Sequence, residues 1–320
     1  MLKESYLKLK VYQKGIKSLF KRFVNLRKGS SYWHLSQGIG KCFVSGELKG
    51  YYNDLTGKIS WNGPQDNAGV PLTQFSDGRK VYFPTTITQK ALGHYDIFLI
   101  SKDDAHLREF LNLCEWLVNN QDRKGGWSLQ IYKEVTYSAM SQGEAVSCLV
   151  RAYNITNDER FLESTKRALK LMLNPIESGG CTYYYNEDIY LEEFPSKDKN
   201  TILNGWIFSI FGIYDYYLLT RDKGIEKVLN RTISTLKKSL ALFDSGFWSY
   251  YDEKKNIASP FYHDLHINQL QALYLITNDQ VFKNYQEKWG GYKRKFINKN
   301  LALLVKIYQK LKNPPEVMTE

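Results

Sequence analysis

The stretch NITNDERFL, at Asn154–Leu162, decides the fold of this chain because the same turn recurs three more times. The other copies are LISKDDAHL at Leu99–Leu107, LLTRDKGIE at Leu218–Glu226 and LITNDQVFK at Leu275–Lys283. Their shared aspartates follow one another at intervals of 55, 64 and 57 residues. Self-similarity at a nearly constant period indicates a repeat architecture. A Ser or Thr stands two positions before each aspartate, and we expect it to cap the helix that follows.

Each turn separates two helices of different character. The helix before it is apolar on all sides, as in MSQGEAVSCLVRAY (Met140–Tyr153) and LNGWIFSIFGIYDYYL (Leu203–Leu218). The helix after it has one apolar face, as in REFLNLCEWLVNNQ (Arg108–Gln121) and ESTKRALKLML (Glu163–Leu173). Helices of the first kind belong inside a protein and helices of the second kind outside. The sequence therefore predicts a mainly α protein, an incomplete α/α toroid of about four helix pairs.

The predicted domain organisation follows from changes in composition along the chain. Residues 1–35 form a basic amphipathic helical segment, and residues 36–84, rich in Gly, Asn, Asp and Pro, form a short β-rich connector. Residues 85–312 form the toroid, which carries the catalytic domain, and residues 313–320 form a tail. Loops with Gly and aromatic residues, such as SGGCTYYY at Ser178–Tyr185, stand between each outer helix and the next inner one, and we expect hairpins or turns there.

The positive charge of the chain is local. The net charge of the 320 residues is +11, but Met1–Ser30 alone holds nine Lys or Arg and one acid, so only +3 remains for the rest. Nucleic-acid binding is therefore disfavoured. We expect the basic segment either to pack on the body as a solvated helix or to lie on an anionic membrane surface or polyanion.

Cysteine usage and the amino-terminal sequence bear on the compartment. The four cysteines, Cys42, Cys114, Cys148 and Cys181, are scattered without metal-ligand spacing and are expected to be reduced. No secretory signal pattern is present at the amino terminus. The expected location is cytoplasmic, at the inner face of the membrane.

Aromatic residues give the first indication of a ligand. They make up 15% of the chain and include 24 tyrosines, which suit either a groove that stacks sugar rings or a protein interface. The chain has no P-loop, GxSxG, HExxH or GxGxxG motif, so nucleotide, serine-hydrolase and zincin functions have no support. Polar residues instead gather in the loops after the outer helices, including an insertion at Asp188–Ser196.

Three blocks of sequence resemble a known enzyme family. They are AMSQGEAVSCLVRAYNIT (Ala139–Thr156), EEFPSKDKNTILNGWIFSIFGIYDYY (Glu192–Tyr217) and YYDEKKNIASPFYHDLHINQLQALYLIT (Tyr250–Thr277). In this order they resemble the C-terminal catalytic region of the D-glucuronyl 5-epimerases, which act on heparosan and heparan-type polymers. The similarity extends from Tyr82 to Lys293. It implies an isomerase that turns D-glucuronyl into L-iduronyl units, an acidic polysaccharide partner, no cofactor, and a homodimer.

The resemblance also implies which residues carry the chemistry. Inversion at carbon 5 needs one group to take a proton and another to return it to the opposite face. Glu193 and Tyr262 are the acid and base candidates, with Tyr251 beside them; a raised pKa for the glutamate and a lowered pKa for the tyrosines, from nearby cations, would suit the exchange. Glu193 could instead cap a loop or pair with a lysine, and the tyrosines could stack on sugars. One departure stands out: Phe194 replaces a family tyrosine. Its hydroxyl is therefore dispensable, or is replaced by a neighbour such as Tyr190, or the activity is altered.

A second group of residues is expected to bind the substrate. Its members are Tyr82, Gln142, Arg151, Tyr190, Asn204, His263, His266 and Asn268. Arg151 could neutralise a uronate carboxylate or tie helices together. His263 and His266 lack further ligands at metal spacing, so no metal site is predicted; they either organise the tyrosine loop or bind the sugar. Two other functions remain open: a polysaccharide lyase, which begins with the same proton abstraction, and a non-catalytic glycan-binding toroid.

Overall fold

The computed structural model describes residues 35–60, 62–75, 78–130 and 136–313. The predicted basic helical segment therefore lies outside the described residues, except for Leu35, and so does the tail, except for Asn313. Within those ranges no helix is long and apolar enough to cross a membrane.

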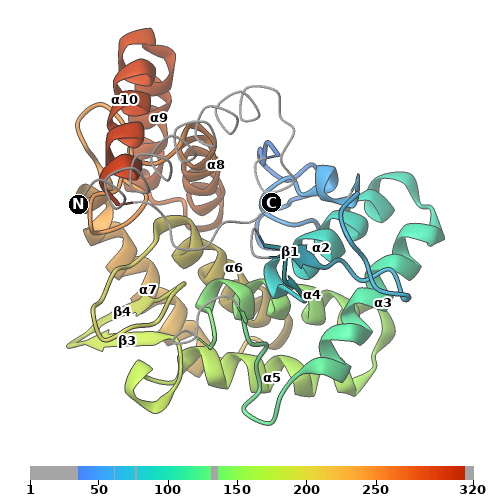
Figure 1. Cartoon of the computed structure of the whole chain (residues 1–320). Coiled ribbons are helices and arrows are strands. Elements are labelled where there is room, and N and C mark those ends of the chain that lie inside the picture. The colour runs from blue at the N-terminus through green and yellow to red at the C-terminus, as the bar shows by residue number, and fades with distance from the viewer. Residues whose placement is uncertain (1–34, 61, 76–77, 131–135, 314–320) are drawn as a thin grey trace, which may run out of the picture.

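Four helix pairs and one further helix make up most of the described structure (Figure 1). The pairs are α2 (Pro84–Ser101) with α3 (Asp104–Asn120), α4 (Ala139–Thr156) with α5 (Glu159–Leu173), α6 (Leu203–Thr220) with α7 (Lys223–Ser239), and α8 (Pro260–Thr277) with α9 (Gln280–Arg294). Helix α10 (Phe296–Lys312) follows α9 and packs against it. The predicted order of inner and outer helices is confirmed, because nearly every residue of α4 and α6 is buried while α5 and α7 bury one face.

The inner helices run side by side in one direction. Contacts lead from α2 to α4, from α4 to α6 and from α6 to α8, so the four pairs form an incomplete α/α toroid. Thr85 and Ser141 hydroxyls lie 3.0 Å apart near the starts of α2 and α4, and further along the helices the Thr88 hydroxyl donates to Glu144 over 3.1 Å. This parallel arrangement places the amino-terminal turns of the inner helices at one end of the toroid.

A buried ion pair ties the other half of these helices to the connector. Arg151 of α4 pairs with Asp215 of α6 at 2.6 Å and donates to the carbonyl oxygens of Lys49 and Gly50. The Tyr52 hydroxyl donates to the same Asp215 carboxylate, and the Tyr52 ring stacks on Phe211 with centroids 4.2 Å apart. The described connector thus anchors itself in the toroid core rather than standing apart from it.

In the repeated turns, the residue that caps the outer helix is not the one predicted from the sequence. The aspartate is the cap: Asp103, for example, accepts a hydrogen bond from the Ala105 amide at 2.8 Å. The Ser or Thr two positions earlier instead accepts the amide of that aspartate, as Thr156 does from Asp158 at 3.2 Å. The prediction that Ser or Thr caps the helix was therefore wrong. The residue between them, such as Asn157 with φ 54°, ends the inner helix in the left-handed conformation.

Strands are short and few in the described residues. In the connector, β1 (Thr73–Gln74) pairs with β2 (Lys80–Val81), and a 3-10 helix, η2, spans Thr56–Ser60. The predicted hairpin at the loop after α5 is confirmed: β3 (Thr182–Tyr185) pairs antiparallel with β4 (Asp188–Leu191), with Tyr183 opposite Tyr190. This hairpin packs against α7 (Figure 1). It leads the chain directly into the Glu192–Pro195 segment.

Candidate active site

Glu193 lies at the end of the toroid where the inner helices begin. The segment that carries it is fixed by its neighbour Glu192, whose backbone amide donates to Cys181 and whose carbonyl accepts the Ala139 amide at the start of α4. The Glu193 side chain packs on the first turn of α6. A β-carbon on Gly205 would lie 2.3 Å from Glu193 Oε2 and 2.8 Å from its Cβ, so only glycine leaves room for this carboxyl group.

The environment of Glu193 favours its neutral form. Its Oε2 atom is buried and has no hydrogen-bond partner among the residues that the structure describes. Burial raises the Glu193 pKa to about 8, and the charges of Glu144 and Glu192 act in the same direction. A carboxyl group with a pKa near neutrality can both take and release a proton, which is what acid–base catalysis needs.

Tyr251 and Tyr262 lie beside each other and next to Glu193. Their ring centroids are 4.8 Å apart and the rings are inclined by 60°. Tyr262 is in the first turn of α8, and the Tyr251 carbonyl accepts the Leu203 amide at the start of α6 over 3.1 Å. The structure therefore brings together all three residues that the sequence analysis nominated for proton transfer.

The electrostatics of the two tyrosines differ from the expectation. Burial raises the pKa of both phenols, and the largest charge effect on each comes from Glu193, which raises it further. The predicted lowering of the pKa by cations is wrong for these two groups, because burial and the charge of Glu193 have the largest effects and both raise the pKa. The Lys306 ammonium lies 5.7 Å from the Tyr251 ring, but it donates to the Ile257 carbonyl. Both phenols are therefore neutral proton donors near pH 7.

Three more nominated residues present unsatisfied polar atoms in the same region. Gln142 of α4 is fully buried, and neither atom of its side-chain amide has a partner in the described part of the chain. The same holds for Asn204 Oδ1 in the first turn of α6 and for His266 Nε2 in α8. Buried polar atoms are ordinarily hydrogen-bonded, so these four atoms are available to a polar ligand or to water.

Other nominated residues are committed to contacts within the protein. Arg151 is fully buried in its pair with Asp215, which corresponds to the structural alternative. His263 accepts the Ser249 amide at Nδ1, lies 3.1 Å from the Trp289 carbonyl at Nε2, and stacks on Trp248. Burial lowers its pKa to about 3, so it is a neutral histidine that holds the loop before α8 in place. Through Ser249, which also contacts His266 Nδ1 at 2.9 Å, His263 positions the second histidine.

The remaining three nominated residues lie in separate settings. The Asn268 amide donates to the Gln37 carbonyl at 3.1 Å. The Tyr82 hydroxyl donates to Asp66 at 2.9 Å, and its ring packs on Trp116. Tyr190 packs on Trp206 and lies under the Lys199 ammonium, 3.8 Å from its ring centroid. None of these contacts joins Tyr190 to Glu193.

Sequence analysis missed a second buried carboxyl group. Glu144 of α4 is fully buried and accepts hydrogen bonds from Gln89 at 2.9 Å and Thr88 at 3.1 Å. Burial raises its pKa to about 8, and the charge of the buried Lys58, whose own pKa burial lowers to about 7, acts against that shift. An acidic residue in the middle of an otherwise apolar inner helix was the signal that could have identified it.

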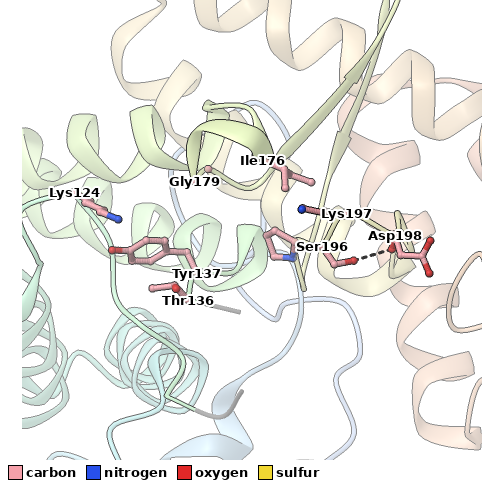
Figure 2. A pocket seen from close by; sticks show the side chains of 10 residues that line it. Lys124, Thr136, Tyr137, Ile176, Gly179, Ser196, Lys197 and Asp198 are labelled. Carbon is pink, nitrogen blue, oxygen red and sulfur yellow. Dashed lines mark hydrogen bonds between the residues drawn. The ribbon is translucent and has the colours of Figure 1, made fainter. Parts of the chain in front are cut away.

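A cavity of about 660 Å³ opens beside the Glu193 segment (Figure 2). Its lining comes from three loops and comprises Lys124, Thr136, Tyr137, Ile176, Gly179, Gly180, Pro195, Ser196, Lys197 and Asp198. The Tyr137 hydroxyl donates to Asp122, which also accepts amides of the Lys124–Gly126 turn. A volume of this size is typical of a small-molecule site.

Comparison with known proteins gives a match to one family. The sequence profile described as D-glucuronyl C5-epimerase C-terminus matches residues 116–291. A D-glucuronyl C5-epimerase of Caenorhabditis elegans is 28% identical over 223 residues, which cover 61% of this chain and 36% of that protein. An uncharacterized protein of Methanocaldococcus jannaschii is 30% identical over 258 residues, covering 70% of this chain and 83% of the other. The chain thus spans about a third of the length of the nematode enzyme.

Solved structures show a distant likeness. A family 88 glycosyl hydrolase from Bacteroides vulgatus aligns with a TM-score of 0.47 at 12% identity, over 78% of this chain and 81% of that one. An unsaturated glucuronyl hydrolase specific for heparin aligns with a TM-score of 0.46 at 11% identity, over 74% and 80%.

Proposed function

The chain belongs to the D-glucuronyl C5-epimerase C-terminus family, and from this premise we propose that it is a uronate epimerase. Its proposed substrate is a heparosan-like acidic polysaccharide, in which it converts D-glucuronyl into L-iduronyl units. The observation that carries the proposal is the meeting of Glu193, Tyr251 and Tyr262 at one end of the toroid, where a carboxyl group and two phenols share one partly buried space.

The protonation states suggest the direction of each transfer. The Glu193 carboxylate takes the proton from carbon 5 and becomes a carboxylic acid, while the electron pair passes into the substrate carboxylate as an enediolate. The neutral phenol of Tyr262 then delivers its proton to the opposite face of carbon 5. The resulting tyrosinate recovers a proton from Glu193, directly or through Tyr251, so that the site returns to its starting state without a net change in oxidation.

The enediolate needs hydrogen-bond donors, because charge that develops in a dry site is stabilised chiefly by preorganised donors. The Gln142 amide group is buried and unpartnered among the described residues, and it would donate to a carboxylate oxygen of the sugar. His266 has the opposite role. His263 Nε2 donates to the Trp289 carbonyl, so His263 Nδ1 takes the Ser249 hydroxyl proton. His266 Nδ1 in turn donates to Ser249 Oγ. His266 Nε2 is then an acceptor, suited to a sugar hydroxyl rather than to the enediolate.

The test is solvent exchange. The protein is incubated with heparosan in heavy water, and deuterium at carbon 5 and the iduronate content are measured by NMR. We expect both in the parent protein, neither in Glu193→Gln, and full activity in the control Glu187→Gln, whose carboxyl is exposed in the β3–β4 turn. Absence of exchange in a folded parent protein that binds heparosan would refute the epimerase. Unsaturated products that absorb in the ultraviolet would identify a lyase instead.

A further inference from the structure

The cavity beside Glu193 has an electropositive lining that the epimerase mechanism does not use. Figure 2 shows Lys124 and Lys197 on opposite sides of the space, with the Asp198 side chain turned away from Tyr137. Over the described ranges, neither lysine has an acidic group within 4 Å, whereas Asp198 pairs with Lys254 at 3.4 Å. The carboxylate nearest Lys124 in sequence, Asp122, is occupied by three backbone amides and the Tyr137 hydroxyl.

The rest of the lining is suited to a sugar ring. Tyr137, Ile176 and Pro195 offer apolar surface, and Gly179, with open space where a β-carbon would stand, lets a ligand approach the backbone closely. Small-molecule pockets usually have mostly apolar walls with a few polar or charged groups. Two ammonium groups without acidic partners in the described part of the chain add a preference for an anion.

The cavity and the proposed reaction centre share one segment of chain. Pro195 is two residues after Glu193, so their α-carbons are no more than about 7 Å apart. Tyr137, which also lines the cavity, is two residues before Ala139, whose amide donates to the Glu192 carbonyl at 3.0 Å. A polymer with one unit at Glu193 therefore has neighbouring units within reach of the cavity.

We propose that this cavity is a binding subsite for a neighbouring acidic sugar of the same polymer, whose carboxylate or sulfate group lies between Lys124 and Lys197. The inference rests on the proposed function, because it needs a polysaccharide at Glu193. It extends that function in one respect: recognition includes a negative charge away from the reacting sugar, so interior units of a chain bind better than a single uronate.

The test measures binding separately from catalysis. All variants are made in the Glu193→Gln background, and affinity for a heparosan hexasaccharide is measured by calorimetry at low salt. The double substitution Lys124→Ala/Lys197→Ala should weaken binding about tenfold, as expected for two exposed charge contacts. The matched control Lys166→Ala/Lys223→Ala removes the same charge from outer helices α5 and α7, where each lysine pairs with a glutamate of its own helix, and should bind as the background does.

Three comparisons complete the experiment. A free glucuronate monosaccharide should lose no affinity in the double variant, because it cannot fill both places. An N-sulfated hexasaccharide distinguishes the anion: equal losses for both polymers assign a carboxylate, and a loss confined to the sulfated one assigns a sulfate. Equal affinity of the Lys124/Lys197 and control variants for both the heparosan and the N-sulfated hexasaccharide would overturn the subsite, even where exchange at carbon 5 has established the epimerase.

Discussion

Gly205→Ala is the sharpest perturbation of the proposed site, because one methyl group must displace the carboxyl of Glu193. The added β-carbon would lie 2.3 Å from Glu193 Oε2, 2.8 Å from Cβ and 3.0 Å from Cδ. Contacts below 3.0 Å are not sustained between such atoms, so the Glu193 side chain must move by several tenths of an ångström or more.

Stability and activity should respond very differently to this substitution. Overpacking costs about 1–3 kcal/mol, and Gly→Ala in a helix recovers up to about 1 kcal/mol, so the free energy of unfolding should fall by roughly 2 kcal/mol or less. A displacement of about 1 Å at a reacting group, in contrast, can lower a rate about 100-fold. We therefore expect a folded protein whose carbon 5 exchange is reduced by about two orders of magnitude.

The assay combines urea unfolding with deuterium exchange at carbon 5. Gly290→Ala in α9 is the matched control, because its new β-carbon would lie 3.7 Å from the end of the flexible Arg294 side chain, an ordinary van der Waals contact. It should keep full activity and gain stability. If Gly205→Ala keeps the exchange rate of the parent protein while unfolding normally, Glu193 does not act from this position and the mechanism is refuted.

Three further predictions test other parts of the structure. Because the Glu193 pKa is raised to about 8 and its carboxylate is the base, the exchange rate should increase with pH up to about pH 8 and then level off. If the Glu193→Gln variant keeps any residual exchange, its rate should not show this increase. Arg151→Ala leaves the Asp215 charge buried without its partner and should lower the free energy of unfolding by about 3–5 kcal/mol in urea. Asp158→Ala removes the cap of α5 and should cost about 1 kcal/mol in the same assay, more than Thr156→Ala; the reverse order would contradict the assignment of the cap.

The sequence predicted the architecture because its decisive signals are local. Each of the four turns is a short motif, and the helices on its two sides, such as MSQGEAVSCLVRAY and ESTKRALKLML, differ clearly in their apolar pattern. These signals need only neighbouring residues, and they predicted the pairing of the helices in the right order. The identity of the cap was missed for the same reason. Thr156 and Asp158 are both good capping residues, and only the backbone geometry of the turn assigns the helix amides to the aspartate.

The electrostatics of the site were beyond the sequence because they depend on packing between distant segments. The residue types of Tyr251 and Tyr262 do not reveal that Glu193, some 60 residues away, is their strongest charged neighbour. Nor does an isolated Glu144 reveal that Gln89 and Thr88 from another helix enclose it. Burial and partner decide the direction of a pKa shift, and neither is encoded in a short motif.

Under the proposed function, the fold itself supplies positive potential for a uronate carboxylate. Glu193, Tyr262 and Asn204 all lie at the end where the parallel inner helices begin. Helix amino termini carry a partial positive charge and amides without helical partners. In the proposed mechanism that potential stabilises the uronate carboxylate and its enediolate, while burial keeps the pKa of Glu193 high enough for its carboxylate to take a proton. A lysine in the same position would hold the substrate more tightly, but it would also lower the pKa of Glu193 and weaken it as a base. If the proposed subsite holds the polymer, placing the cations in the neighbouring cavity, at Lys124 and Lys197, separates binding of the polymer from the basicity of Glu193.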